Sequence, residues 1–110
     1  MIIRFQRSIG IRLFRFGRRQ AELWICPVGE KLPVHRHPNM ESRIVFLGGR
    51  MLFTRDARTI PLGFSKILRS FVVKAGQAHG AIVTGRFGMF LNLEKWLIKP
   101  TSAAHDFIRT

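Results

Sequence analysis

The 110-residue sequence has a single cysteine, no tyrosine and only six acidic residues. One cysteine, Cys26, excludes an internal disulfide bond, which favours a reducing compartment such as the cytoplasm, and we expect its thiol to be buried as a small hydrophobe rather than reactive. No apolar run approaches the roughly 18 residues that cross a bilayer, and arginines interrupt every candidate signal segment. Repeats and linkers are also absent, so we expect one domain over residues 1–110.

The scarcity of acidic residues leaves a large excess of positive charge. Nineteen Lys and Arg, most of them arginine, oppose six Asp and Glu, which gives a formal net charge of +13. Such an excess favours anionic partners, among them nucleic acid, acidic proteins and anionic small molecules. A solvated surface that binds none of these is equally compatible with the charge, because net charge specifies neither a fold nor a partner.

Most of the chain alternates apolar and polar residues, which is the pattern of half-buried β-strands. The pattern of the basic segment 1–19 predicts two strands, with a break near residues 8–10 and a slip in the alternation at residues 13–14. Its two-residue period favours strands over the alternative, an amphipathic helix on a membrane surface. Further strands are expected over 20–26, 32–37, 42–47, 50–55, 65–74 and 87–93. Turns are expected at 38–39, 48–49 and 85–86, a loop over 56–63, and helical turns over 102–109 in the tail 100–110. The sequence therefore predicts an all-β fold with a short C-terminal helical tail.

Three side chains that can bind a metal stand close together: His35, His37 and Glu41. On a β-strand, a spacing of two residues places both imidazoles on one face. We expect the strand 42–47 to return beside the strand 32–37 as a hairpin, which would bring the Glu41 carboxylate next to the imidazoles. Two imidazoles and a carboxylate suit a divalent transition metal that keeps open positions for substrate.

This stretch resembles the first motif of the cupins, in which a glycine, a His-x-His pair, a glutamate and a second glycine stand at fixed spacing. Gly29, His35, His37, Glu41 and Gly48 occupy all of these positions. The resemblance implies a small antiparallel β-barrel or jelly roll with a metal ion in its mouth. It also implies a fourth ligand, a histidine from a second motif further along the chain.

The second motif is only half present in this chain. Gly76 and His79 match it, whereas Lys74 and Val83 stand where the family has a proline and an asparagine, and Leu68 stands where it has a glycine. A turn at the glycine can direct the following strand toward the first motif. We therefore carry His79 over as the fourth ligand.

The resemblance implies a metal-dependent enzyme of the oxygenase or isomerase type that acts on a small molecule. Imidazole and carboxylate ligands suit Fe, Mn, Ni or Zn. Arg43 shares a strand face with Glu41, so we expect it to steady an anionic substrate, with a salt bridge at the rim as the alternative. Without a metal, the histidines would be polar lining residues and Glu41 would pair with Arg36 or Arg43.

Two other functions remain open at this point. The protein is then either a non-catalytic basic module that binds nucleic acid or an acidic protein, or a structural subunit of an assembly. Cupins commonly pair through sheet faces, so the resemblance also implies a homodimer. Single-domain cupins of this layout are similar to small proteins of bacterial viruses, which implies a phage-type protein in a bacterial cytoplasm.

Overall fold

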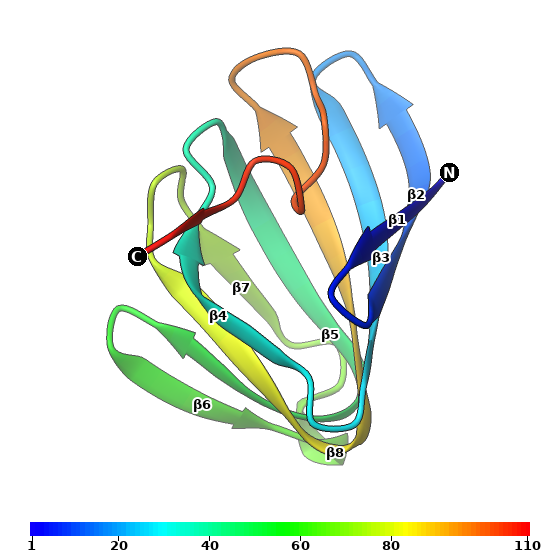
Figure 1. The fold of residues 1–110 in the computed structure, drawn as a ribbon, viewed down its shortest axis with the longest axis vertical. Coiled ribbons are helices and arrows are strands. Elements are labelled where there is room, and N and C mark those ends of the chain that lie inside the picture. The colour runs from blue at the N-terminus through cyan, green and yellow to red at the C-terminus, as the bar shows by residue number, and fades with distance from the viewer.

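The structure, a computed structural model, describes all residues from 1 to 110 and is a curled antiparallel β-sheet (Figure 1). No α-helix is present, and the single 3-10 turn is η1 (Phe64–Lys66). The strands are β1 (Ile2–Phe5), β2 (Ser8–Phe16), β3 (Arg19–Pro27), β4 (Lys31–Arg36), β5 (Met40–Arg55), β6 (Arg58–Leu62), β7 (Ser70–Val73), β8 (His79–Trp96) and β9 (Ile108–Arg109).

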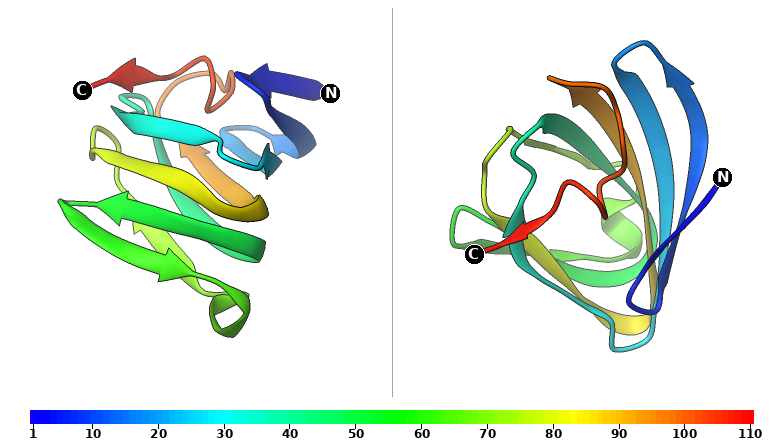
Figure 2. Two further views of the ribbon diagram at one scale, coloured as in Figure 1. Left: turned by 60° about the horizontal axis from the view of Figure 1, so that its bottom comes forward. Right: turned by 45° about the horizontal axis from the view of Figure 1, so that its top comes forward.

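The two longest strands, β5 and β8, pair with each other along almost their whole length, from Met40 opposite Trp96 to Arg55 opposite His79. Strand β8 also pairs with β3 through its second half and with β4 through its first, while β5 pairs with β6 and β7. The bent pair therefore belongs to both walls of the curled sheet. Figure 2 (right) looks into the mouth that these walls enclose.

Glycines allow β5 and β8 to cross closely where they bend. Gly49 lies opposite Gly88 at a β-bulge, with a φ of +80°, and a Cβ atom at Gly49 would collide with the Phe87 carbonyl oxygen. A side chain cannot occupy that position, and only glycine adopts such a φ without strain. The turns predicted at 48–49 and 85–86 are therefore wrong, because the glycines bend two continuous strands instead of ending them.

The strand pairing also overturns the hairpin expected after the His-x-His pair. Pro38 and Asn39 do form a turn, but β4 pairs with β8 and β9, and β5 does not lie beside it. The loop predicted over 56–63 is in fact the tip and second strand of the β5–β6 hairpin. The strand predicted over 65–74 is shorter, since η1 and a turn precede β7.

The basic N-terminal segment forms two strands, as predicted, with the turn at Gln6 and Arg7 rather than at residues 8–10. Gln6 adopts a φ of +55° in this turn, which begins two residues before the predicted position. The slip in alternation at Leu13 and Phe14 corresponds to a bulge in the pairing of β2 with β3. A break in the two-residue period therefore located a real irregularity of the strand.

The C-terminal tail is not helical, so this prediction is wrong. The His105 and Asp106 amides both donate to the Ser102 carbonyl oxygen, and the Ser102 hydroxyl accepts from the His105 amide. These bonds close one turn, after which the chain extends into β9 and pairs with β4. Pairing with an exposed strand edge satisfies the backbone of the last residues better than a helix of one turn would.

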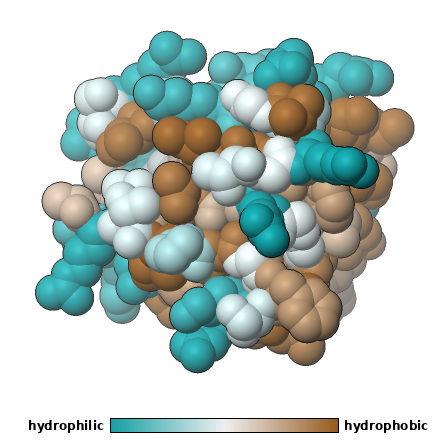
Figure 3. All heavy atoms as spheres, turned by 90° about the horizontal axis from the view of Figure 1, so that it is seen from below, coloured by the Kyte–Doolittle hydropathy of each residue, from teal (hydrophilic) through white to brown (hydrophobic).

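The apolar core lies between the two walls, and Cys26 is completely buried within it, as predicted. The structure contains no helix of the length and apolar character that crossing a bilayer requires. Seen from below, the surface carries hydrophobic and hydrophilic residues side by side (Figure 3). The buried core residues are Cys26, Ile44, Phe46, Met51, Phe53, Leu62, Val73, Ala81 and Val83.

Candidate metal centre

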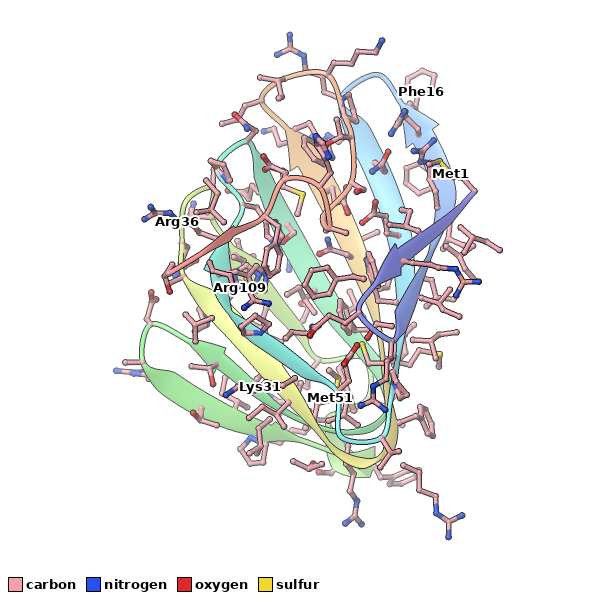
Figure 4. All side chains as sticks on the ribbon, viewed as in Figure 1. Met1, Phe16, Lys31, Arg36, Met51 and Arg109 are labelled. Carbon is pink, nitrogen blue, oxygen red and sulfur yellow. The ribbon has the colours of Figure 1, made fainter.

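Three histidines converge inside the mouth of the curled sheet. His35 and His37 lie two residues apart at the end of β4, and His79 begins β8 directly opposite His35. One potential ligand atom from each lies within 4.8 Å of the other two. The exposed Arg36, the last residue of β4, separates His35 from His37 and points away from the barrel (Figure 4), as strand alternation requires.

The turn before β8 positions His79. Gly76 has a φ of +79°, and its amide donates to the His37 carbonyl oxygen at 2.9 Å. This bond ties the turn to the chain that carries the other two histidines. Gly76 therefore makes the expected turn, and the turn places His79 beside His35 and His37.

Each of the three imidazoles is held through its Nδ1 atom by a backbone carbonyl oxygen. His35 Nδ1 lies 2.6 Å from the Pro33 oxygen, His79 Nδ1 lies 3.1 Å from the Gln77 oxygen, and His37 Nδ1 bonds to the Asp106 oxygen. A carbonyl oxygen can only accept, so each Nδ1 carries the hydrogen. In a neutral imidazole, the Nε2 lone pair is then free for a ligand.

Burial keeps these imidazoles neutral. Loss of solvation, helped by the neighbouring histidines, lowers the pKa of His35 to about 3 and of His79 to about 4. Burial also lowers the pKa of His37, although the Asp106 carbonyl and carboxylate oppose that shift. Around pH 7, three lone pairs therefore face the same small volume.

The separation of two of these atoms fits a shared metal ion. His35 Nε2 lies 3.2 Å from His37 Nε2, with no hydrogen available between two lone pairs. Two imidazole nitrogens bound to one ion at about 2.1 Å lie roughly 3 to 3.4 Å apart. The donor atoms, their protonation and their spacing all fit a divalent transition metal.

The structure does not bring Glu41 to the histidines. Its neighbours Met40 and Ser42 point inward from β5, so the Glu41 side chain lies on the outer face, where it pairs with Lys74 at 3.7 Å and is 40% exposed. The alternation of β5 already contained this signal, because Glu41 shares its parity with exposed Arg43 rather than with buried Ile44.

Arg43 also lies outside the cavity. It is exposed on the outer face of β5 and donates to the Ser70 hydroxyl at 3.2 Å. No lysine or arginine lines the cavity that holds the histidines. The sequence suggested that Arg43 would bind an anionic substrate, but no cationic side chain is present in the cavity to do so.

The cavity has a volume of about 70 Å³ and is lined mainly by apolar side chains. Apart from the three histidines, its only polar side chain is Asn92 from β8. An apolar lining of this kind lowers the local dielectric constant and strengthens the electrostatic interactions inside the cavity. The apolar lining residues are Phe5, Trp24, Leu32, Ile44, Phe46, Met51, Phe53, Leu62, Ala81, Phe90, Ala103, Ala104 and Phe107.

The C-terminal segment completes the site, which the sequence did not predict. Phe107 stacks on the His35 ring at 4.1 Å between centroids, and Asp106 accepts from the Asn39 amide and side chain at 2.9 and 2.8 Å. In Figure 2 (right) this segment, in red, crosses the mouth of the barrel. His105, in the same segment, is exposed.

A second buried polar group, which the sequence analysis missed, lies on β3 and β8 and is centred on Glu22 and Glu94. Glu94 accepts from Gln20, Trp96 and Asn92 at 2.8–2.9 Å, and Glu22 accepts from Gln20, Trp24 and the Ala103 amide at 3.1–3.2 Å. Burial, together with the hydrogen bond to Glu22, raises the pKa of Glu94 to about 9. The sequence signal that could have identified this cluster is the presence of polar residues at alternate positions of two strands, 20 and 22 on β3 and 92 and 94 on β8.

Comparison with known proteins agrees with this architecture. No family model matches the sequence, and no curated protein matches it. Among solved structures, a Klebsiella pneumoniae protein with a double-stranded β-helix domain superposes with a TM-score of 0.73 at 16% identity, over 96% of this chain and 87% of its own. The Schizosaccharomyces pombe Cnp3 cupin domain superposes with a TM-score of 0.72 at 19% identity, over 84% and 66%.

The fold is that of a single-domain cupin. KdgF from Halomonas has the same cupin fold, with a TM-score of 0.74 at 13% identity over 89% of this chain and 83% of its own. The DMSP lyase DddQ from Ruegeria pomeroyi superposes with a TM-score of 0.76 at 21% identity over 94% of this chain, which spans 52% of that protein. The antiparallel barrel expected from the cupin resemblance is thus confirmed, and a three-histidine group lies in its mouth.

Proposed function

We propose that the protein is a metal-binding cupin in which His35, His37 and His79 hold one divalent transition metal ion through their Nε2 atoms. The observation that carries this proposal is the shared hydrogen-bonding pattern of the imidazoles. All three Nδ1 atoms are engaged by backbone carbonyl oxygens, so all three lone pairs are left for one ligand.

The same site supports a metal-dependent enzyme, of the oxygenase or isomerase type, that acts on a small molecule. Three protein ligands leave coordination positions open, and a bound ion would supply Lewis acidity or a site for oxygen chemistry. The side chains of the apolar lining exclude water, and Phe107 holds the His35 ring from the side of the mouth. One structural neighbour is a lyase, which supports a catalytic use of this fold.

Metal analysis of protein purified without an affinity tag tests the proposal. We expect about one Fe, Mn, Ni or Zn ion per chain in the wild type and in His105→Ala, which removes an exposed histidine outside the group. His35→Ala should lose the ion. Equal metal content in His35→Ala and His105→Ala would overturn the proposal. The identity of the metal follows from the same measurement.

A second candidate function rests on the outer surface. A concavity on the outside of the barrel is lined by Arg19, Arg43 and Lys95, with Phe14 at its side and Glu41 as the exposed carboxylate. Cations next to an exposed aromatic ring are the elements of non-specific binding to single-stranded nucleic acid. We infer that a polyanion partner binds here, because three cations and an exposed aromatic ring line this concavity, whereas no lysine or arginine lines the inner cavity.

Salt dependence separates this function from the first. Binding of a single-stranded oligonucleotide should weaken steeply between 50 and 200 mM salt. Arg19→Ser should reduce the slope of log K against log salt concentration by about one. Metal removal should leave that binding unchanged, because the concavity contains no histidine. Absence of binding at 50 mM salt would remove this candidate and leave the metal site untouched.

We also propose a homodimer in which outer sheet faces pair. The exposed apolar side chains Leu13, Phe14 and Phe16 of β2 support it, and Phe16 projects away from the barrel (Figure 4) with 83% of its surface exposed. Burying such residues against a second copy would remove apolar surface from water. Light scattering should give twice the chain mass for the wild type and a smaller mass for Phe16→Ser, whereas a monomeric wild type would contradict the proposal.

A further inference from the structure

The cavity contains one polar side chain whose hydrogen bonds are incomplete. Asn92 is 4% exposed, lines the cavity together with the three histidines, and donates from Nδ2 to Glu94 Oε2 at 2.9 Å. Its Oδ1 atom is buried and has no hydrogen-bond partner. A buried acceptor without a donor costs about 1–3 kcal/mol, so such an atom in a cavity marks a position for a ligand.

The orientation of the Asn92 amide follows from its neighbours. Glu94 Oε1 already accepts from Gln20 Nε2 at 2.9 Å and from Trp96 Nε1 at 2.8 Å, so Oε2 is the oxygen that faces Asn92. The proton that Glu94 retains is shared with Glu22, with which Glu94 hydrogen-bonds, so Oε2 presents a lone pair to Asn92 Nδ2. Gln20 is itself fixed, because its Oε1 accepts from Arg15 Nε at 2.6 Å. The chain of bonds from Arg15 to Asn92 therefore leaves Oδ1, an acceptor, as the free end of the amide.

The rest of the lining restricts the ligand further. The cavity is small and apolar, and no lysine, arginine, aspartate or glutamate lines it. Transferring a charged group from water into such a volume without a counter-charge is strongly unfavourable. A ligand that pairs with Oδ1 must bring a hydrogen-bond donor, and the remainder of its surface must be apolar.

We propose that the cavity takes a small, uncharged, mainly apolar molecule with one hydrogen-bond donor, such as a hydroxyl group, and that Asn92 Oδ1 accepts from that donor. This inference rests on the proposed function in one respect: the three histidines and Asn92 line the same cavity, so a molecule bound there lies between them. Asn92 is the residue that selects the ligand, and Glu94 is a positioning residue that sets the direction of its amide.

Two isomers of equal composition, 1-butanol and methyl propyl ether, test the proposal because only the alcohol can donate. Each is titrated into chelator-treated protein, and affinity is followed by the NMR shifts of the Ala103 and Ala104 methyl groups. In Asn92→Leu, the alcohol-to-ether affinity ratio should fall at least about fivefold, the value of one neutral hydrogen bond. Leu91→Ala, next to Asn92 on β8 but on the opposite face and outside the cavity, should keep the wild-type ratio.

In a second variant, Glu94→Gln, we expect the preference for the alcohol over the ether to be reversed rather than lost. The oxygen of the new side-chain amide must stay opposite the Gln20 and Trp96 donors, so the nitrogen of that amide faces Asn92 and turns the Asn92 amide over. The cavity then presents a donor, and the ratio should shift toward the ether. An unchanged ratio in both Asn92→Leu and Glu94→Gln would overturn the inference, and Asn92→Ala replaces the leucine variant if that does not fold.

The experiment is independent of the metal. Chelator-treated protein that shows the Asn92-dependent ratio, but never binds an ion in metal analysis, would overturn the proposed function and leave this inference standing. Protein that binds one ion through the histidines, but shows the same ratio in wild type and Asn92→Leu, would do the opposite. The two proposals can therefore fail separately.

Discussion

The inside of the barrel holds two buried polar groups that differ in how they are satisfied. The carboxylate group, centred on Glu22 and Glu94, receives donors from side chains and backbone on all four carboxyl oxygen atoms. The histidine group on β4 and β8 is bonded only on its outer side, through Nδ1, and leaves three Nε2 atoms facing one another.

Both groups obey the same electrostatic rule. Burial favours the uncharged form, so the pKa of the histidines falls and the pKa of Glu94 rises. Perturbed pKa values alone therefore do not distinguish a site from a structural network. The difference lies in the unpaired lone pairs, which a structural network would fill and which a ligand-binding group must keep.

The largest expected effect separates the two groups by stability. Glu22→Ala leaves the Trp24 and Ala103 donors without their acceptor and removes one of the acceptors of Gln20, so the free energy of unfolding should fall by about 3 kcal/mol or more. In metal-free protein, His79→Ala should cost less than half as much, because it breaks one hydrogen bond, from Nδ1 to the Gln77 carbonyl oxygen, and its Nε2 has no partner to lose. Urea unfolding measures both, and an equal cost would contradict the comparison.

The next effect concerns ligand binding to the histidine group alone. Addition of Zn²⁺ at about 100 times its dissociation constant should stabilise the folded protein by roughly 2.7 kcal/mol. His37→Ala should remove this stabilisation, while His105→Ala should retain it. Thermal unfolding with and without the ion provides the measurement, and a wild-type protein that gains nothing would remove the distinction between the two groups.

Acid should destabilise the metal-free protein through the histidines. Their pKa values in the folded state, about 3 for His35 and about 4 for His79, lie below the ordinary value of 6.5. The unfolded chain thus takes up protons first, and the stability present above pH 6.5 is lost as pH falls toward those values. Each histidine should contribute at most about 1.4 kcal/mol per pH unit.

Urea unfolding at pH 7, 6 and 5 checks this dependence. His79→Gln should reduce the slope, because an amide does not titrate, while His105→Gln should leave it as in the wild type. Constant stability between pH 7 and 5 would show that the three imidazoles are not held neutral by burial.

The buried cluster around Glu22 and Glu94 should change the stability of the protein with pH in the opposite direction. Glu94 has a folded-state pKa of about 9 against an ordinary 4.5, so the folded protein keeps a proton that the unfolded chain has released. Stability should therefore fall as pH rises from 7 to 9, by no more than about 1.4 kcal/mol per unit. Glu94→Gln should flatten this profile and Glu41→Gln should not, as measured by urea unfolding at the two pH values.

The smallest effect tests the residue that the cupin resemblance placed at the metal. Glu41→Gln should change the free energy of unfolding by less than about 0.5 kcal/mol, since its exposed pair with Lys74 contributes little. The metal content of this variant should equal that of the wild type. Loss of the ion in Glu41→Gln would instead restore Glu41 as a ligand and require β5 to turn its other face inward.

The sequence predicted the type of the elements better than their connections. Alternation identified strands along most of the chain, and the slip at Leu13 located a bulge in β2. It did not reveal that β5 and β8 continue through their glycines, because glycine is equally suited to a turn and to a bulge. The hairpin expected to bring Glu41 to the histidines was wrong for a different reason. Which strands pair depends on long-range contacts, and these leave no signal in the local sequence.

Local sequence determined the all-β character of the chain, the shared face of His35 and His37, and the turn at Gly76 that precedes His79, because each depends on strand alternation or on the conformational freedom of one glycine. Tertiary structure alone decided that β4 lies beside β8, that Glu41 faces outward, that the C-terminal segment closes the mouth, and that Asn92 faces the histidines' cavity. Those outcomes depend on which distant strands pair and on which way a closed sheet curves, and neither is encoded in any short stretch of residues.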